Sequence, residues 1–309
     1  MASNPGPAQA ARSHGAGVRL RASVEDLPAA VAAALAGAPE DCSGARRAVV
    51  ENGGIPWATI AWGDSSSPPL VLVHGVTSNA DTFWRIGPAV AASGRHVVAV
   101  ELPGHGRTGH WRGRHPFADT AREVAGFLRA ARLDRPDLAI LGHSWGAMVV
   151  AALPSAGIRA DRLILMDPPA LPVSAMESMT RDPVERWYAT LDEATAVIAA
   201  ANPGWSRGDV RAKALGLTQF DIEAVRSVLI DNGDWDGGLA ALADPAAAGI
   251  ETWYILGEFE TGGLVPDAAV PALATRVGPD HVLVVAGAPH SPQRTHPEAT
   301  VLAILRALA

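Results

Sequence analysis

The chain has 309 residues, which is long enough to bury a substantial core, and we expect one α/β domain that carries an insertion. A hydrophobic content of 48% with 18% charged residues excludes a disordered chain. The formal net charge of -7 argues against nucleic acid or an anionic membrane surface as a partner, and no apolar run approaches the length of a membrane span.

The N-terminal segment is expected to lie outside the main fold. Residues 1–22 are rich in Ala, Gly, Pro and Ser, which is typical of a loose leader. The apolar stretch 27–36 resembles a secretory leader, but Glu25 and Asp26 stand where such a leader carries positive charge. We therefore predict a short surface helix, and assign residues 1–44 to a leader and this helix. Cys42 is the only cysteine, so no intramolecular disulfide is expected and we predict a cytoplasmic protein.

The next segment predicts a β-hairpin. Two strand-like runs, 45–51 and 55–62, flank Asn52-Gly53-Gly54, which is a turn sequence typical of hairpins. The sheet is therefore expected to begin with an antiparallel pair.

From residue 70 onward, short apolar runs alternate with helical segments, which indicates parallel β-α-β units. The runs are 70–73, 97–100, 138–141, 163–166, 252–256 and 282–285. Helices are predicted at about 80–93, 117–132, 145–153, 266–277 and 297–308.

The gap between the fourth and fifth runs is too long for a simple crossover. It contains no strand-like run, but helical patterns occur at about 183–201, 207–215 and 219–231. We predict a helical cap over residues 168–235, inserted into a core made of residues 45–167 and 236–309. Most large side chains of the cap are expected to pack within it, and a few are expected to face the cleft. The large side chains are Met176, Met179, Trp187, Tyr188, Trp205, Phe220 and Trp235.

The third run leads into the pentapeptide Gly142-His-Ser-Trp-Gly146, followed by an apolar segment of helix length. A serine between a buried strand and a helix lies on a sharp turn, where a Cβ at either glycine would collide with neighbouring backbone. Such a turn exposes Ser144 Oγ above the sheet edge as a nucleophile. The alternative interpretation is that Ser144 only caps the helix that follows.

Ligands of an open parallel sheet bind beyond the carboxyl ends of its strands, so the residues that follow each run are the functional candidates. These residues are His74-Gly75-Val76, Glu101 to Gly106, Asp167, Gly257 to Glu260, and Gly287 to His290.

Taken together, His74-Gly75, Leu102-Pro-Gly-His-Gly106, Gly142 to Gly146, Gly257-Glu-Phe-Glu260 and Gly287-Ala-Pro-His290 resemble the α/β-hydrolase fold superfamily. The resemblance implies a mostly parallel eight-stranded sheet, with helices on both faces and a helical cap inserted after strand 6. It further implies that Ser144 is the nucleophile and His290 the general base, since an imidazole is needed to activate a serine hydroxyl. His143 and His296 are weaker candidates. His296 precedes Pro297-Glu298 at a predicted helix start, which favours a capping role, and His143 is expected to point away from the nucleophile.

The resemblance leaves the acid of the triad open. Glu260 is the preferred residue although the family more often has Asp there, and Asp167 and Glu258 are the alternatives. The oxyanion hole is expected to be formed by the backbone N–H groups of Val76 and Trp145. No cofactor or metal is expected. His105, His110 and His115 are spaced by five, but they are interpreted as solvated loop histidines and not as ligands.

The favoured function is cleavage of a carboxylic ester or lactone of a small to medium hydrophobic substrate through an acyl-enzyme. The same triad supports two alternatives: a C–C bond hydrolase, or an aminopeptidase resembling proline iminopeptidases. The aminopeptidase requires acidic cap residues to hold an amine, with Glu177, Asp182, Glu185, Asp192 and Glu193 as candidates. A non-catalytic ligand-binding protein is the remaining alternative. The partner is therefore predicted to be a small-molecule substrate, and the oligomeric state is left open.

Overall fold

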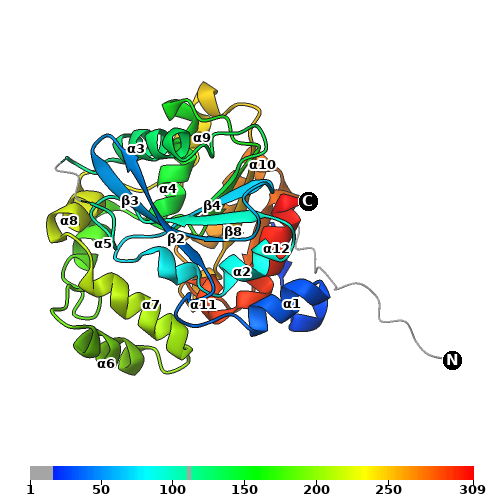
Figure 1. Ribbon diagram of the computed structural model, residues 1–309. Coiled ribbons are helices and arrows are strands. Elements are labelled where there is room, and N and C mark those ends of the chain that lie inside the picture. The colour runs from blue at the N-terminus through cyan, green and yellow to red at the C-terminus, as the bar shows by residue number, and fades with distance from the viewer. Residues whose placement is uncertain (1–16, 110–112) are drawn as a thin grey trace.

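The computed structural model describes residues 17–109 and 113–309, and it is organised around one mixed sheet (Figure 1). The strand order is β1-β9-β8-β7-β6-β4-β5-β3-β2. The strands are β1 Val18–Leu20, β2 Arg46–Asn52, β3 Ile55–Trp62, β4 Pro69–Val73, β5 His96–Val100, β6 Ala139–His143, β7 Arg162–Met166, β8 Glu251–Leu256 and β9 Val282–Val285. The strands β2 and β3 form the antiparallel hairpin, β3 also pairs antiparallel with β5, and the remaining pairs are parallel.

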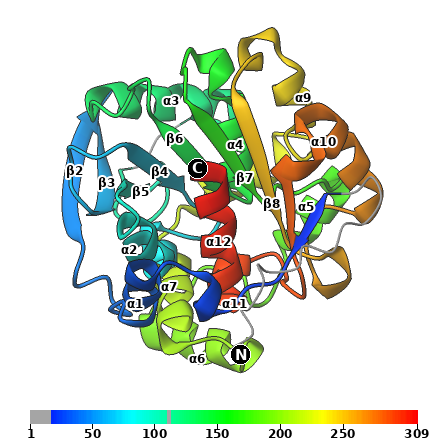
Figure 2. The same cartoon turned by 90° about the vertical axis from the view of Figure 1, so that its right-hand side faces the viewer.

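The central strands are apolar throughout because helices cover both faces of the sheet. In β4, Val71 and Val73 belong to the core on one face, and Leu70 and Leu72 to the core on the other. The first core includes α3 Phe117–Ala130, α4 Trp145–Ala152 and α10 Val270–Val277. The second includes α1 Ala29–Ala36, α2 Ile86–Ala91 and α12 Pro297–Leu308, which crosses the sheet in Figure 2. The mostly parallel sheet with helices on both faces is therefore confirmed.

The strand count differs from the expected eight because the leader contributes an additional strand. The short strand β1 pairs parallel with β9 at the sheet edge, and Figure 2 shows it in blue beside the C-terminal part of the chain. The next helix, α1, buries Val31 and Leu35 against the second core, so it is more than a surface helix. The three residues of β1 pair with residues more than 260 positions away in the chain. No local pattern marks such a strand, and the leader prediction therefore missed it.

The segment between β7 and β8 is a helical insert. Its helices are α5 Val173–Met179, α6 Leu191–Ala201, α7 Arg207–Thr218 and α8 Ile222–Ile230, followed by the short α9 Leu239–Ala243. The two ends of the insert are tied together, because Trp235 N donates to Leu171 O at 2.8 Å and Val173 N donates to Asp234 Oδ1 at 2.7 Å. We call residues 168–235 the cap; its status as a separate domain stays a prediction.

Within the described ranges, no helix combines the length and the apolar character that a membrane crossing requires.

Candidate active site

Ser144 lies on the tight turn between β6 and α4, at the carboxyl edge of the sheet. Its backbone has φ 56° and ψ -124°, a conformation that non-glycine residues rarely adopt. A Cβ on Gly142 would collide with the carbonyl of Gly146, and a Cβ on Gly146 would collide with the carbonyl of Val73. The Ser144 side chain makes no capping hydrogen bond to α4, so the capping interpretation does not describe this serine.

Three side chains from distant parts of the chain form a continuous line of hydrogen bonds. Ser144 Oγ lies 2.9 Å from His290 Nε2, and His290 Nδ1 lies 2.7 Å from Asp167 Oδ2. Asp167 follows β7 directly and is fully buried. Its carboxylate also accepts the backbone N–H groups of Gly257 and Leu264, each at 3.0 Å. These amides fix the carboxylate, and Nδ1–H donation to it leaves His290 Nε2 free to accept a proton from Ser144.

The acid beside His290 is therefore Asp167, the alternative candidate, and not the preferred Glu260. The preferred residue lies on a 3-10 turn, Phe259–Thr261, where it is exposed and makes no side-chain hydrogen bond or ion pair within the described part of the chain. Glu258 accepts from Gly287 N at 2.6 Å and pairs with Arg19 of β1, so it joins the edge strand to the loop before His290. The β8 loop supplies amides to Asp167, and its own carboxylates point elsewhere.

His143 does not point away from the nucleophile's side, contrary to the sequence-based expectation. Its ring packs beside that of His290 at 4.8 Å between centroids, and its Nε2 lies 2.9 Å from the backbone oxygen of His290. Burial, together with the nearby His290, holds the pKa of His143 well below its ordinary value. His143 is therefore a neutral donor whose hydrogen bond holds the backbone of His290.

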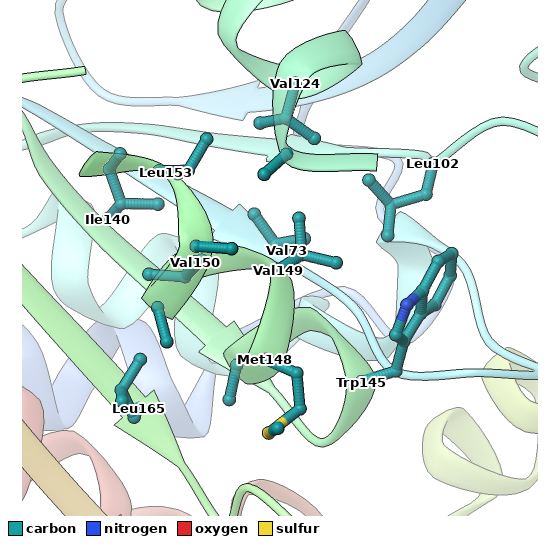
Figure 3. Close-up of a cluster of buried hydrophobic side chains, with 14 of the residues drawn as sticks. Val73, Leu102, Val124, Ile140, Trp145, Met148, Val149, Val150, Leu153 and Leu165 are labelled. Atoms are coloured by element: carbon teal, nitrogen blue, oxygen red, sulfur yellow. The ribbon is translucent and has the colours of Figure 1, made fainter. Parts of the chain in front are cut away.

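The loop after β4 passes directly over Ser144. A Cβ on Gly75 would lie 2.9 Å from Ser144 Cβ, so only glycine allows this approach. Val76 follows, and the backbone amides of Val76 and Trp145 donate no hydrogen bond to other residues in the described ranges. The indole of Trp145 points into the buried cluster with Leu102 and Val149, as Figure 3 shows, so this side chain serves the core and not the cavity.

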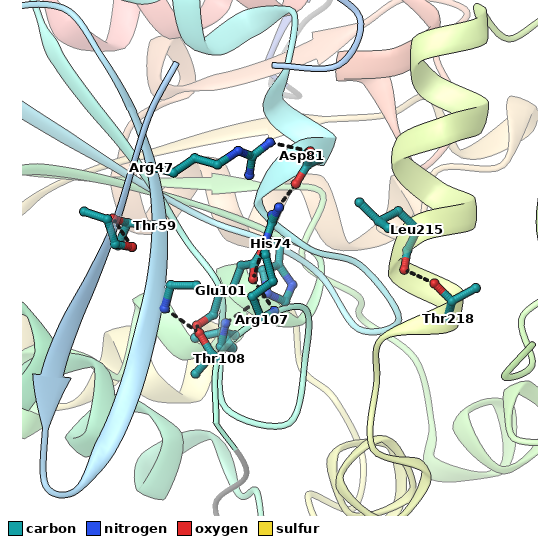
Figure 4. A network of polar contacts seen from close by, with 12 residues as sticks. Arg47, Thr59, His74, Asp81, Glu101, Arg107, Thr108, Leu215 and Thr218 are labelled. Atoms are coloured by element: carbon teal, nitrogen blue, oxygen red, sulfur yellow. Dashed lines mark hydrogen bonds and ion pairs between the residues drawn. The ribbon is translucent and has the colours of Figure 1, made fainter. Parts of the chain in front are cut away.

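The loop after β5 packs against His74, the residue before Gly75. Arg107 pairs with the buried carboxylates of Glu101 and Asp81, which Figure 4 shows around His74. His74 is buried, with Nε2 accepting from Leu102 N at 3.0 Å and Nδ1 donating to Gly75 O at 2.7 Å. Burial lowers its pKa to about 4, so it is a neutral spacer under the Gly75 loop.

Two of the three loop histidines are buried, in contrast to the sequence-based interpretation. His105 is buried and packs 5.1 Å from the Trp145 ring, and His115 is also buried, while His110 lies outside the described residues. No group of three potential metal ligands occurs among the residues that the structure describes.

A cavity of about 330 Å³ opens at Ser144 and His290, and cap residues form its far wall. Met179 and Trp205 are the cap side chains of the expected set that reach it. The lining also includes Lys213 and Arg294, two buried cations that sequence reasoning missed. Lys213 is the only lysine of the chain, and this was the one feature of the sequence that could have pointed to it.

Lys213 connects the cap to the Gly75 loop. From α7, its Nζ donates to Thr77 Oγ1 at 2.9 Å and to Thr77 O at 3.2 Å, and it pairs with Glu185. Thr77 itself has φ 53°, a left-handed conformation that these contacts hold in place. Burial lowers the pKa of Lys213, and the charge of Glu185 opposes that shift.

A second cavity of about 450 Å³ adjoins the first, since both are lined by Val76, Thr77, Met179 and Glu185. Its other walls are mostly apolar side chains of the cap, with two arginines and a threonine among them: Trp187, Phe220, Ile222, Val225, Leu229, Arg186, Arg226 and Thr180. Ser144 and His290 thus line a polar cavity that adjoins a mostly apolar one.

Comparison with known sequences is consistent with this architecture. The serine hydrolase-like protein of Homo sapiens is 32% identical over 127 residues, which cover 37% of this chain and 58% of that protein. The monoacylglycerol lipase of Mycolicibacterium smegmatis is 32% identical over 108 residues, covering 32% of this chain and 38% of the lipase. The matches therefore span less than two thirds of either relative.

Solved structures match over most of the chain. The crystal structure of E-2-(acetamidomethylene)succinate hydrolase superposes with a TM-score of 0.69 at 20% identity, covering 85% of this chain and 99% of that one. An esterase from Exiguobacterium antarcticum gives 0.67 at 11% identity, with the same two coverages. At these identities the likeness shows the fold alone. The family model described as alpha/beta hydrolase fold matches residues 68–258, well over half of the chain, and the protein therefore belongs to the α/β-hydrolase fold family.

Proposed function

We propose that this protein is a serine hydrolase that cleaves a carboxylic ester or lactone of a small to medium hydrophobic substrate through an acyl-enzyme. The observation that carries the proposal is the unbroken line of hydrogen bonds from Ser144 through His290 to Asp167. An inert serine would have no need of an oriented imidazole, whereas a nucleophilic serine requires one.

In the proposed mechanism, His290 Nε2 takes the proton of Ser144 as Oγ attacks the substrate carbonyl carbon. The imidazolium that forms is stabilised by Asp167, which stays ionised. His290 then gives the proton to the leaving alcohol oxygen, and the C–O bond of the ester breaks to leave an acyl-Ser144 enzyme. A water activated by His290 releases the acid and restores the serine; in a lactone, alcohol and acid remain in one molecule.

The developing oxyanion is assigned to the backbone amides of Val76 and Trp145. Both are at the nucleophile, one on the Gly75 loop and the other at the first position of α4, where helix amides have no intrahelical acceptor. Such donors are each worth about 10² to 10³ in rate. The adjoining apolar cavity of about 450 Å³ supports a hydrophobic group on the substrate.

The test is turnover of short p-nitrophenyl esters by purified protein. We expect Ser144→Ala to lower kcat by about 10⁶, as loss of the serine does in other Ser-His-Asp enzymes. Ser65→Ala, an exposed serine outside the site, is the matched control and is expected to keep full activity. Wild-type protein that hydrolyses none of the esters, lactones or arylamides offered would favour the ligand-binding alternative.

One observation favours the aminopeptidase alternative. Of the five acidic cap residues considered, Asp182 and Glu185 line the catalytic cavity. Glu185 is engaged by Lys213, so an amine would depend on Asp182. Faster turnover of proline or alanine arylamides than of matched esters would select this alternative, and turnover of a β-diketone would select the C–C bond hydrolase.

A further inference from the structure

Arg294 has an unusual environment for a charged side chain in this protein. It lies on the short helix α11, Pro292–Thr295, four residues after His290, and it is only 8% exposed. Its side chain lines the same cavity as Ser144 and His290. A guanidinium removed from water is unfavourable unless an anion or several acceptors replace the solvent.

The protein supplies only part of that replacement. Arg294 Nη2 donates to Thr82 Oγ1 at 3.0 Å, and the guanidinium lies over the ring of Trp205 at 4.7 Å. Its Nε is buried and has no hydrogen-bond partner, and no carboxylate of the described ranges lies within ion-pair distance of it. Thr82 and Trp205 thus orient a cation whose charge is left unmatched.

The two carboxylates that act electrostatically on Arg294 are already paired with other cations. Asp209 pairs with Arg85 at 3.1 Å, and Glu185 pairs with Lys213. Both favour the charged form of Arg294, while burial is the larger effect and lowers its pKa. Lys213 faces the same cavity and carries the same sign of charge.

Asp182 is the remaining carboxylate of the cavity wall. It is only half-buried, and its Oδ1 accepts the backbone N–H groups of Val184 at 2.7 Å and Glu185 at 3.1 Å. Solvent and these amides satisfy its charge without Arg294. The chamber beside the nucleophile therefore keeps one oriented, buried and unmatched positive charge.

We propose that Arg294 binds a carboxylate group of the substrate, so that the ester or lactone cleaved at Ser144 carries a free carboxylate in addition to the scissile bond. This inference rests on the proposed function and names its substrate class. A planar carboxylate matches the fork of guanidinium donors that Thr82 leaves unused. The apolar cavity then receives the uncharged remainder of the substrate.

The test compares acids with their neutral methyl esters. One pair is mono-p-nitrophenyl glutarate and its methyl ester, which carry the second group on the acyl side; the other is 4-acetoxybenzoate and its methyl ester, which carry it on the alcohol side. We expect wild-type protein to favour the acid of at least one pair in kcat/KM, and free glutarate to inhibit turnover of the neutral esters competitively. A charge-assisted pair of hydrogen bonds corresponds to a preference of about 10- to 100-fold.

The residue assignment is tested by the ratio of kcat/KM for acid over methyl ester. Arg294→Gln is expected to reduce this ratio by about 10- to 100-fold, and Arg294→Lys to reduce it less, because an ammonium keeps the charge but not the fork. Arg207→Gln, which removes an exposed cap arginine outside the catalytic cavity, is the matched control and should keep the wild-type ratio. If Arg294→Gln fails to fold, Arg294→Lys and the wild-type preference carry the test.

The outcomes separate the two proposals. Wild-type turnover of the neutral esters without preference for either acid overturns the carboxylate site and leaves the hydrolase intact. An unchanged ratio in Arg294→Gln or Arg294→Lys overturns the assignment to this residue. Absence of any turnover contradicts the proposed function itself.

Discussion

Asp167 accepts hydrogen bonds from His290 and from the backbone amides of Gly257 and Leu264. These three donors hold an otherwise isolated carboxylate in one position at the end of β7. Its backbone has φ 43°, a strained conformation for a non-glycine residue. At the scale of single residues, the orientation of His290 thus depends on Asp167 and not on the acids of the β8 loop.

We predict that Asp167→Asn lowers kcat for p-nitrophenyl esters by about 10⁴, as the corresponding change does in a Ser-His-Asp triad, because the imidazole then favours the wrong tautomer. Glu260→Gln is the matched control and should stay within a few-fold of wild type, since Glu260 is exposed. Steady-state kinetics on protein shown to be folded by circular dichroism provides the measurement. A larger loss of kcat in Glu260→Gln than in Asp167→Asn would identify Glu260 as the acid of the triad.

Sequence reasoning identified Ser144 and His290 as candidates but ranked the acids in the wrong order for this geometry. The glutamates at 258 and 260 share one short loop, and spacing does not tell which side chain turns inward. The structure separates them through contacts with Arg19 and Gly287, which lie far away in the sequence. Arg294 was missed for the same reason: its burial depends on Thr82 and Trp205.

At the scale of elements, the cap helix α7 is coupled to the loop after β4. Lys213 donates to both oxygens of Thr77, next to the proposed oxyanion donor Val76. Gly216 of the same helix approaches closely as well, since a Cβ there would lie 2.9 Å from Thr77 O. The cap therefore acts as a support for this loop in addition to covering the cavity.

We predict that Lys213→Met lowers kcat by up to about 10², because the Thr77 turn loses its donors and Val76 N–H drifts from the oxyanion position. Lys213 is a positioning residue, so KM should change much less than kcat. The double variant Lys213→Met with Glu185→Gln removes the carboxylate left unpaired, and it should recover stability without recovering kcat. If the double variant recovered both stability and kcat, Lys213 would have a structural role only.

Element prediction succeeded where the pattern was local. The run 282–285 coincides with β9, and the helix predicted at 297–308 coincides with α12. The predicted helix 183–201 begins only at Leu191, because Asp182 and the following residues form a hydrogen-bonded turn. Short elements such as α5 and β1 depend on tertiary partners and carry little periodicity of their own.

In the molecule as a whole, the four buried histidines of the described residues make folding sensitive to acid: His74, His105, His115 and His143. Burial holds the pKa of His105 and His143 well below the ordinary value, lowers the pKa of His115, and lowers that of His74 to about 4. In the unfolded chain each titrates near 6.5. Between about pH 4 and 6.5 the unfolded chain therefore binds protons that the folded protein does not, and stability falls as the pH falls through this window.

Urea unfolding at pH 7.5, 6.5, 6.0 and 5.5 measures this effect. Each histidine contributes a slope of at most about 1.4 kcal/mol per pH unit, so the four together reach at most about 5.5 kcal/mol per unit. The free energy of unfolding should be level above pH 7 and decline below 6.5. A free energy of unfolding that stays constant down to pH 5.5 would mean that these side chains are protonated in the folded protein.

Every function proposed for this protein depends on Ser144 being a nucleophile that His290 and Asp167 activate. Incubation with a fluorophosphonate followed by peptide mass spectrometry tests it most directly, because the reagent reacts covalently with an activated serine. We predict one adduct per chain on the peptide that contains Ser144, strongly slowed labelling in His290→Ala, and no adduct in Ser144→Ala. An unlabelled wild-type protein, or an adduct that maps to another residue, would show that Ser144 is not an activated nucleophile.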